Sequence, residues 1–427
     1  MKSADEALAE ILLHAIVLPG EELALREGRG RVLAQPLLAG RTLPPFDNSE
    51  MDGYAVLARD LEGAPVWLPM VETVAAGHPS ACSLQAGTTA RIFTGAPLPQ
   101  GADAVVKQED VLREGARVRF EKRVSPGAFV RPQGSDLAAG EVALGAGTRL
   151  GPPELGLAAA LGATWLSVVR RPIVAVLSTG DELVEPEQSL GPGQIVNSNA
   201  LALAAAIEDA GATVRLLGIA RDEPADIERR LRAAEDVDVV VTIGGVSVGE
   251  RDCVKEVLAA LGCETSFWRV NVKPGKPLLV GLWRGLGAGP TGTRLVFGLP
   301  GNPASAMVTF ELFVRPALLR MSGLAEVQRP TLRARLAAPI QKRDDRRHFM
   351  RARVHVADGP WAAPLTKQSS GQLTSLIGAN GYIVVPEAAR TLAVGDEVDV
   401  LMVGEWGPMA LAHASPPPSG GSEGPCC

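Results

Sequence analysis

The 427-residue sequence predicts a multidomain protein of the α/β plus β class, with a doubly wound α/β domain at its centre. Between residues 172 and 321, segments with the periods of strands and of helices alternate, which is typical of a parallel sheet with helices on both faces. Residues 46–147 carry short apolar segments between glycine and proline turns, and residues 330–401 carry a further run of strands. At about 150 residues per domain, the length suffices for two to four domains.

The composition argues against proteins that bind nucleic acids or anionic membranes. The formal net charge is −6 and aromatic residues make up only 4% of the chain, so neither an excess of cations nor many stacking platforms are present. The five cysteines form no CxxC pair, and their odd number favours a reducing compartment over a disulfide framework. The amino-terminal segment predicts an amphipathic helix rather than a signal peptide, and the most apolar stretch, 155–169, is shorter than the roughly 20 residues that span a bilayer. We therefore expect a cytoplasmic protein.

The predicted elements follow in order along the chain. The first forty residues predict a helix and a short strand at 31–33, and a second helix is expected at 152–161. The β-rich region is expected to hold strands at 54–58, 104–107 and 118–120. The α/β region is expected to hold strands at 173–177, 213–219 and 237–243 and helices at 199–210, 224–234, 253–261 and 303–321. Strands follow at 331–337, 350–356, 382–385 and 397–401, and the tail after Trp406 is expected to be disordered.

Three loops of the α/β region fall at the carboxyl ends of strands, where a doubly wound sheet binds its ligand. The first, STGDE at 178–182, offers hydroxyls and a glycine turn for an oxyanion and two carboxylates for a divalent cation, although a strand-ending turn with exposed acids has the same composition. The second, GGVSVGERD at 244–252, spaces its glycines like a phosphate loop. Glu250 stands where such a loop needs lysine, which excludes an ordinary P-loop NTPase. Asp252 can bind Mg²⁺ or simply cap the next helix.

The third loop and a pair of lysines complete the candidate site. In GLPGNPAS at 298–305, Asn302 fits an N-cap and Pro303 the first position of a helix, whose free amides can seat an anion; a plain capping turn explains the same residues. Lys273 and Lys276, in KPGKP, can present fixed charges to an oxyanion or be ordinary solvated surface. A G-x-G-x-x-G pattern at 287–292 has no helix after it, and GVSVG at 245–249 lacks evident triad partners. The residues alone thus indicate a Mg²⁺-dependent enzyme acting on phosphoesters.

These loops and the segment PFDNSEMDGYAV at 45–56 resemble the molybdopterin molybdenumtransferase family, to which MoeA and the gephyrin E domain belong. RIFTGAP at 91–97 and RPQGSD at 131–136 also match, and the resemblance spans roughly residues 7 to 403. The combination of DNSEMDGYA, TGDE, GGVSVG, KPGKP and GLPGNP is far more specific than a single glycine motif.

The resemblance implies an elongated homodimer of four-domain subunits, with the site between the third domain of one subunit and the second domain of its partner. The implied domains are a discontinuous helical domain at 1–44 and 142–169, a β-rich domain at 45–141, an α/β molybdopterin-binding domain at 170–326 and a small C-terminal β-barrel at 327–405, before a disordered tail at 406–427.

The resemblance also implies a reaction, the Mg²⁺-dependent insertion of molybdate into adenylylated molybdopterin, which releases AMP and gives molybdenum cofactor. By matching positions, the acids near Mg²⁺ would be Glu182, Asp222 and Asp252. Molybdate would be held by Lys273, Lys276, Arg351 and Ser370, and the second domain would contribute Asp52, Thr94 and Asp136. The pterin substrate would be bound by the three loops at Thr179, Gly180, Asp181, Gly244, Gly245, Ser247, Gly249, Pro300, Gly301, Asn302 and Pro303.

The implied partners are small-molecule substrates, a second copy of the chain, the molybdopterin adenylyltransferase and the enzymes that accept the cofactor, with no nucleic acid and no membrane. Three alternatives stay open at this point: an adenylyltransferase-like step on molybdopterin, a tungstate-inserting paralogue, and a non-catalytic scaffold of the same fold. The acidic second loop and the additional domains favour insertion over adenylylation.

Overall fold

The computed structural model describes residues 1–234, 236–245, 253–284 and 292–404. It divides into two compact units, each described here by itself: unit 1 is Met1–Glu21 with Val169–Cys427, and unit 2 is Glu22–Val168. The tail after Trp406 lies outside the described residues.

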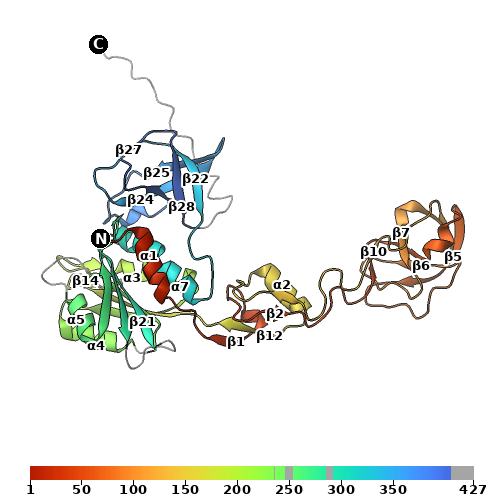
Figure 1. Ribbon diagram of the computed structural model, residues 1–427, viewed down its shortest axis with the longest axis horizontal. Helices are drawn as coiled ribbons and strands as arrows, with labels where there is room; N and C mark the ends of the chain where they lie inside the picture. Colours follow the sequence, from red (N-terminus) through yellow and green to blue (C-terminus); the bar gives the residue numbers. More distant parts are fainter. Residues whose placement is uncertain (235, 246–252, 285–291, 405–427) are drawn as a thin grey trace, which may run out of the picture. The chain divides into compact units, whose positions relative to one another are not determined.

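Unit 1 is built on a six-stranded sheet with the order β16-β13-β17-β21-β20-β18 (Figure 1). Its strands are β13 (Ile173–Thr179), β16 (Thr213–Ala220), β17 (Val239–Ile243), β18 (Cys263–Trp268), β20 (Leu279–Arg284) and β21 (Thr293–Leu299). The first four in the order are parallel, whereas β20 runs antiparallel to β21 and β18 antiparallel to β20. The predicted parallel sheet is therefore mixed at one edge, because the connection from β20 to β21 is too short for a parallel crossover.

Helices cover both faces of this sheet, as predicted for a doubly wound domain. They are α1 (Ala4–His14), α3 (Ser198–Asp209), α4 (Pro224–Arg232), α5 (Val254–Ala260), α6 (Pro303–Thr309) and α7 (Arg315–Met321). Helices α4 and α5 lie on one face over Leu177, Val240 and Val296, while α3 and α6 pack together on the other and α1 packs on α7 (Figure 1). The helix predicted at 303–321 contains a π-helical turn, η4 (Phe310–Val314), and Pro316, which has no amide hydrogen to donate, follows it.

The carboxyl-terminal part of unit 1 is the small β-barrel that was predicted. Its strands are β22 (Thr331–Leu336), β24 (Arg347–Val356), β25 (Pro360–Pro364), β26 (Gly381–Val385) and β28 (Glu397–Met402). The barrel closes because β24 pairs with both β25 and β26, and it is filled by side chains such as Leu336, Val354 and Ile383. A short strand of the α/β part, β19 (Val272–Lys273), joins the edge of β24 in parallel. Short pairs and a 3₁₀ turn complete unit 1: β14 (Leu183–Val184) with β15 (Ile195–Val196), β23 (Ile340–Gln341) with β27 (Thr391–Leu392), and η5 (Leu373–Ser375).

Unit 2 holds the predicted β-rich region as a sheet with the order β7-β4-β6-β5-β9-β8. The strands are β4 (Gly53–Val56), β5 (Val66–Val74), β6 (Thr89–Ile92), β7 (Ala104–Lys107), β8 (Val111–Glu114) and β9 (Arg117–Phe120). Strand β4 is buried on both faces: Tyr54 and Val56 pack with Phe120 in one core, and Ala55 packs with Ile92 in another. The sheet is accompanied by η2 (Ala58–Leu61), η3 (Gln108–Asp110) and the pair β3 (Asn48–Ser49) with β10 (Val130–Arg131).

A third core in unit 2 joins the chain before and after the β-rich insertion, as a discontinuous domain requires. Leu33 comes from the first segment, and Leu150, Ala158 and Leu166 come from the second. The elements around it are η1 (Leu25–Glu27), α2 (Pro152–Ala160), the pair β1 (Gly20–Ala24) with β12 (Trp165–Val169), and the pair β2 (Leu37–Leu38) with β11 (Val142–Leu144). The strand predicted at 31–33 forms only two isolated bridges, Val32 to Arg149 and Leu33 to Val168.

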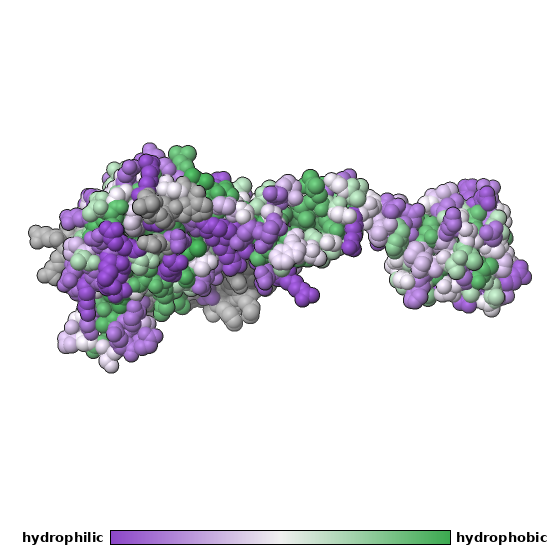
Figure 2. Space-filling model, turned by 90° about the horizontal axis from the view of Figure 1, so that it is seen from below, coloured by the Kyte–Doolittle hydropathy of each residue, from purple (hydrophilic) through white to green (hydrophobic). Residues whose placement is uncertain are grey.

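The surface mixes hydrophilic and hydrophobic residues, as the face shown in Figure 2 illustrates for both units. The most exposed large apolar side chains include Leu13, Ile377 and Trp165. Among the described residues, every helix is too short or too polar to cross a bilayer.

Candidate functional site

The three predicted loops of unit 1 meet at the carboxyl edge of the sheet. Gly244 follows β17 with a φ of +84°, and its amide donates to the Leu299 carbonyl of the third loop at 3.0 Å. A Cβ on Gly244 would lie 2.9 Å from the Thr179 carbonyl oxygen of the first loop. From α3, Asn199 Nδ2 donates to the Gly301 carbonyl at 2.6 Å. These close contacts bring the backbones of the three loops together at one edge of the sheet. Main-chain amides gathered in this way are the geometry of an anion site.

Carboxylates gather at the same edge, after β13 and β16. The Asp181 Oδ1 atom accepts from the Asp222 amide at 3.3 Å, and a Cβ on Gly180 would lie 2.6 Å from Glu182 Oε2. Asp181 and Glu182 are exposed. Within the described ranges, no cluster of three histidine, cysteine or acidic side chains could hold a metal ion. The third predicted ligand, Asp252, lies outside the described residues, as do Ser247 and Gly249.

The third loop leads into α6 as the sequence predicts. Asn302 has extended backbone at the N-cap position and Pro303 begins the helix, although the Asn302 side chain makes no capping hydrogen bond. Instead, the Ala304 amide donates to the Ser370 carbonyl at 3.0 Å. The predicted residue Ser370 therefore lies at the amino end of α6, while Pro300 is buried and Gly301 is exposed beside it.

The KPGKP turn packs on the same helix. Gly275 has a φ of +103°, and a Cβ there would lie 2.4 Å from Thr309 Cγ2 of α6. The two lysines differ in their surroundings. Lys273 Nζ donates to Asp344 Oδ2 at 3.2 Å, whereas the exposed Lys276 side chain makes no hydrogen bond or ion pair with any described residue, and only the Lys276 carbonyl accepts a bond, from the Val270 amide at 3.1 Å.

Arg351, on β24 of the barrel, is 1% exposed. Its Nη2 donates to the carbonyls of Ser369 at 3.2 Å and Lys367 at 3.4 Å, and Gln368 bonds to its backbone on both sides, Oε1 accepting from the amide and Nε2 donating to the carbonyl. Its Nε is buried without a partner among the described residues. Burial lowers the pKa of the guanidinium. A buried cation with an unused donor is energetically costly, and the two carbonyl acceptors of Nη2 offset part of that cost.

In unit 2, the structure joins two of the three predicted residues. Asp52 Oδ1 accepts from both the backbone amide and the hydroxyl of Thr94, each at 2.8 Å. These two bonds, the backbone one first, lower the pKa of Asp52. Asp136 is exposed in a turn held by its amide bond to the Leu43 carbonyl at 3.0 Å, and no described contact links it to the other two.

Sequence comparisons connect these sites to known proteins. The profile of the MoeA N-terminal region (domain I and II) matches residues 2–162, that of a probable molybdopterin binding domain matches 175–320, and that of the MoeA C-terminal region (domain IV) matches 333–403. The chain is 40% identical over 392 residues to molybdopterin molybdenumtransferase 2 of Mycobacterium tuberculosis strain H37Rv, covering 88% of this chain and 93% of that protein.

The chain belongs to the molybdopterin molybdenumtransferase family. It is 38% identical over 392 residues to the molybdopterin molybdenumtransferase of Nostoc sp., covering 90% of this chain and 88% of that one. The crystal structure of the molybdopterin biosynthesis moeA protein from Pyrococcus horikoshii OT3 matches with a TM-score of 0.79 and 31% identity, covering 94% of this chain and all of that chain. The predicted family and the predicted multidomain fold are thus confirmed, and the chain is an enzyme of the transferase class.

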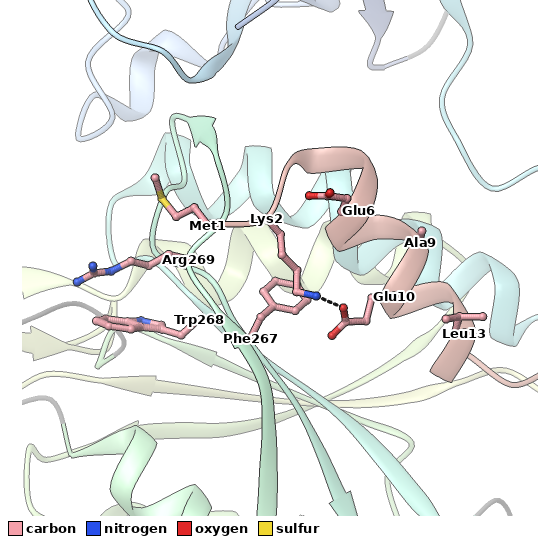
Figure 3. Close-up of a pocket in the computed structure, with 9 residues that line it drawn as sticks. All are labelled: Met1, Lys2, Glu6, Ala9, Glu10, Leu13, Phe267, Trp268 and Arg269. Carbon is pink, nitrogen blue, oxygen red and sulfur yellow. Dashed lines mark hydrogen bonds and ion pairs between the residues drawn. The ribbon is translucent and has the colours of Figure 1, made fainter.

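An open hollow of about 720 Å³ lies elsewhere in unit 1, between α1 and the end of β18 (Figure 3). Lys2 bonds to Glu10 across it, and Phe267, Trp268 and Arg269 form its other wall. None of the predicted site residues lines it. In unit 1, the described contacts of the predicted residues with α6 and the loop before it come from Gly244, Gly275 and Ser370, joined by Asn199.

Sequence reasoning missed two side chains of this assembly. Asn199 could have been found, because it starts the predicted helix that follows the first loop along the chain, and such a helix begins at the same sheet edge as Gly301. Asp344 had no usable signal, since it lies in a run of charged residues, and only the pairing of β19 with β24 brings it to Lys273.

Proposed function

We propose that the chain inserts molybdenum into molybdopterin: it takes molybdate and adenylylated molybdopterin, cleaves the adenylate with Mg²⁺, and releases AMP and molybdenum cofactor. The coarser part, a transferase of molybdenum cofactor biosynthesis, rests on the family. The observation that supports the finer part best is the buried Arg351, whose Nε has no partner among the described residues.

Molybdate is a tetrahedral dianion and needs several fixed donors. Arg351 offers a guanidinium N–H from the barrel, and Lys273 has two N–H donors left after its bond to Asp344. Lys276 adds a third cation from the same turn, and Ser370 lies at the amino end of α6. Charged donors of this kind make the strongest hydrogen bonds to oxyanions.

The glycines of the second loop favour a phosphate-containing substrate. Gly244 and Gly245 have positive φ values of +84° and +65°, and a Cβ on Gly245 would lie 2.9 Å from Thr179 Oγ1. Glycine permits these φ values and the close packing, in which a Cβ on Gly245 would also lie 2.3 Å from Val254 Cγ2, so the loop can turn at the sheet edge where a phosphate would bind.

Magnesium fits the acids of the first loop by donor type, because Asp181, Glu182 and Asp222 all supply the oxygen ligands that Mg²⁺ prefers. We propose that Glu182 and Asp222 hold the ion together with Asp252. The ion would polarise the phosphoryl oxygens during adenylate cleavage. These three carboxylates would fix the position of the ion.

The proposal also includes the oligomeric state, the cellular location, the unit 2 residues and the partners. The enzyme would act as a homodimer of four-domain subunits in the cytoplasm, with Asp52, Thr94 and Asp136 serving the same reaction. The adenylyltransferase would deliver its substrate, and cofactor-accepting enzymes would collect its product.

Molybdate saturation of AMP release tests the proposal. Lys273→Ala should raise the KM for molybdate about tenfold, as expected for the loss of a charged hydrogen bond. Lys122→Ala is the matched control, because Lys122 is an exposed lysine of unit 2 outside all proposed sites. An unchanged KM in Lys273→Ala would remove Lys273 from the oxyanion site.

A further inference from the structure

One carboxylate in unit 1 accepts hydrogen bonds from three neighbouring side chains. Asp344 Oδ2 accepts from Lys273 Nζ at 3.2 Å and from Arg346 Nη2 at 2.8 Å. Asp344 Oδ1 accepts from His348 Nε2 at 2.8 Å and from the Arg346 amide at 3.1 Å. Although burial alone would raise the pKa of Asp344, these bonds from Arg346, His348 and Lys273 hold it well below its usual range. The carboxylate is therefore a fixed anion.

The segment that carries Asp344 is itself held rigidly. Lys342 is 4% exposed, and its Nζ donates to the carbonyls of Arg346 at 2.9 Å, Glu387 at 2.8 Å and Pro386. Arg390 Nη1 donates to the Asp344 carbonyl at 2.7 Å. Both contacts anchor the segment to the barrel, so Asp344 has little freedom to move.

The same segment is joined to the KPGKP turn through the backbone. Strand β19 pairs in parallel with β24, which places Lys273 opposite His348. The Arg347 amide donates to the Asn271 carbonyl at 3.1 Å. A lysine on a flexible four-carbon stem loses substantial side-chain entropy when it binds a ligand, and a fixed partner reduces that loss in advance.

We propose that Asp344 is a positioning residue for Lys273: it fixes the ammonium group with one N–H and leaves two for the oxyanion. This inference rests on the proposed function, in which both lysines of the turn bind the oxyanion. It assigns the two lysines different roles. Lys273 is pre-positioned by the barrel, while Lys276, whose ammonium group has no partner among the described residues, adapts to the substrate.

A double-mutant cycle on the full-length protein tests this, with the KM for molybdate in AMP release as the readout. Asp344→Asn keeps an acceptor of the same shape and removes the charge. It should raise the KM about three- to tenfold, the range expected for coupled neighbours, with kcat nearly unchanged. The effect should vanish in a Lys273→Ala background and persist in a Lys276→Ala background. Asp345→Asn, at the neighbouring acid that pairs with Arg390, should leave the KM unchanged.

The outcomes separate this inference from the proposed function. An equal effect of Asp344→Asn in both lysine backgrounds would reduce Asp344 to a structural role, and a lower KM would make it a competitor of the oxyanion; either result overturns the inference. If Lys273→Ala alone leaves the KM unchanged, the oxyanion site itself is misassigned. Asp344→Glu keeps the charge and moves it by one methylene. It should therefore give a smaller rise in the KM for molybdate, with the same dependence on Lys273. This variant keeps the inference testable if Asp344→Asn folds poorly.

Discussion

Thr94 donates two hydrogen bonds to a single oxygen of Asp52: the backbone amide and the hydroxyl both lie 2.8 Å from Oδ1. The two donors orient the carboxylate and lower its pKa, although the group stays accessible to solvent. Asp52 is thereby an ionised acceptor with a fixed direction, which suits a residue that orients a substrate.

The pKa of Asp52 should rise in Thr94→Val, because this change removes the hydroxyl donor and keeps both the amide and the shape. Since the folded-state pKa is depressed, ionised Asp52 contributes stability above the unfolded value of about 3.9, and this contribution is lost as the pH falls through the folded pKa. The Thr94→Val variant should lose part of this stabilising contribution. Carboxyl ¹³C NMR titration measures the shift directly. Thr88→Val, which removes a hydroxyl bonded to the Gln85 carbonyl, is the control and should leave Asp52 unchanged. An unaltered Asp52 titration in Thr94→Val would contradict the assignment.

Arg351→Met should separate stability from function. Methionine fills the buried volume without an unpaired donor, but it also removes the bonds to the Lys367 and Ser369 carbonyls; because the two effects oppose each other, the free energy of unfolding should stay within about 2 kcal/mol of the parent value. The KM for molybdate should rise about tenfold or more, because a charged donor is lost. Urea unfolding and molybdate saturation check the two parts. Arg353→Met, on the same strand, should keep the parent KM; normal molybdate dependence in Arg351→Met would exclude Arg351 from the site.

Gly275→Ala should be more destabilising than an alanine at an open glycine. The φ of +103° alone would cost about 1 kcal/mol, and contact with Thr309 Cγ2 at 2.4 Å adds a clash, so we expect a total loss of about 2–4 kcal/mol. Gly193→Ala, with a φ of +79° and no atom within 4 Å of its Cβ, isolates the backbone cost. Chemical denaturation of both variants gives the difference. Equal losses of unfolding free energy in Gly275→Ala and Gly193→Ala would mean that the KPGKP turn moves freely away from α6.

Cys263 should resist alkylation in the native protein. Burial, together with the charge of Glu264, raises the pKa of its thiol to about 12, so almost no thiolate exists at pH 8. Iodoacetamide labelling followed by peptide mass mapping should find Cys82, which is exposed, modified well before Cys263. Denaturant should then make both react. Labelling of native Cys263 as fast as Cys82 would show that this part of the sheet opens readily.

The fold was largely predictable because its local signals are strong. The strand predicted at 104–107 has those bounds in the structure, and the helix predicted at 199–210 is displaced by one residue, since apolar runs and glycine ends marked both. Pairing between distant segments was not predictable. Nothing local in Leu279–Arg284 distinguishes an antiparallel strand from a parallel one, and Arg31–Leu33 lacked partners for a full strand.

The candidate site was predictable in its residue types but not in its contacts. Glycine loops at strand ends and the resemblance pointed to Thr179, Gly244 and Lys273; the structure brings Gly244 against Thr179 at the sheet edge and Lys273 against Asp344, all in unit 1. The contact between Lys273 and Asp344 depends on β19 adding to a barrel strand far along the chain, and a sequence does not reveal such a register.

The central claim is that this protein couples adenylate cleavage to molybdenum insertion, and the most direct measurement is AMP release from adenylylated molybdopterin with Mg²⁺, with and without molybdate, beside an assay for active cofactor. We predict that molybdate stimulates AMP release and that active cofactor forms in step with it. Bound substrate with no AMP release under either condition would contradict the account and favour a non-catalytic scaffold of the same fold.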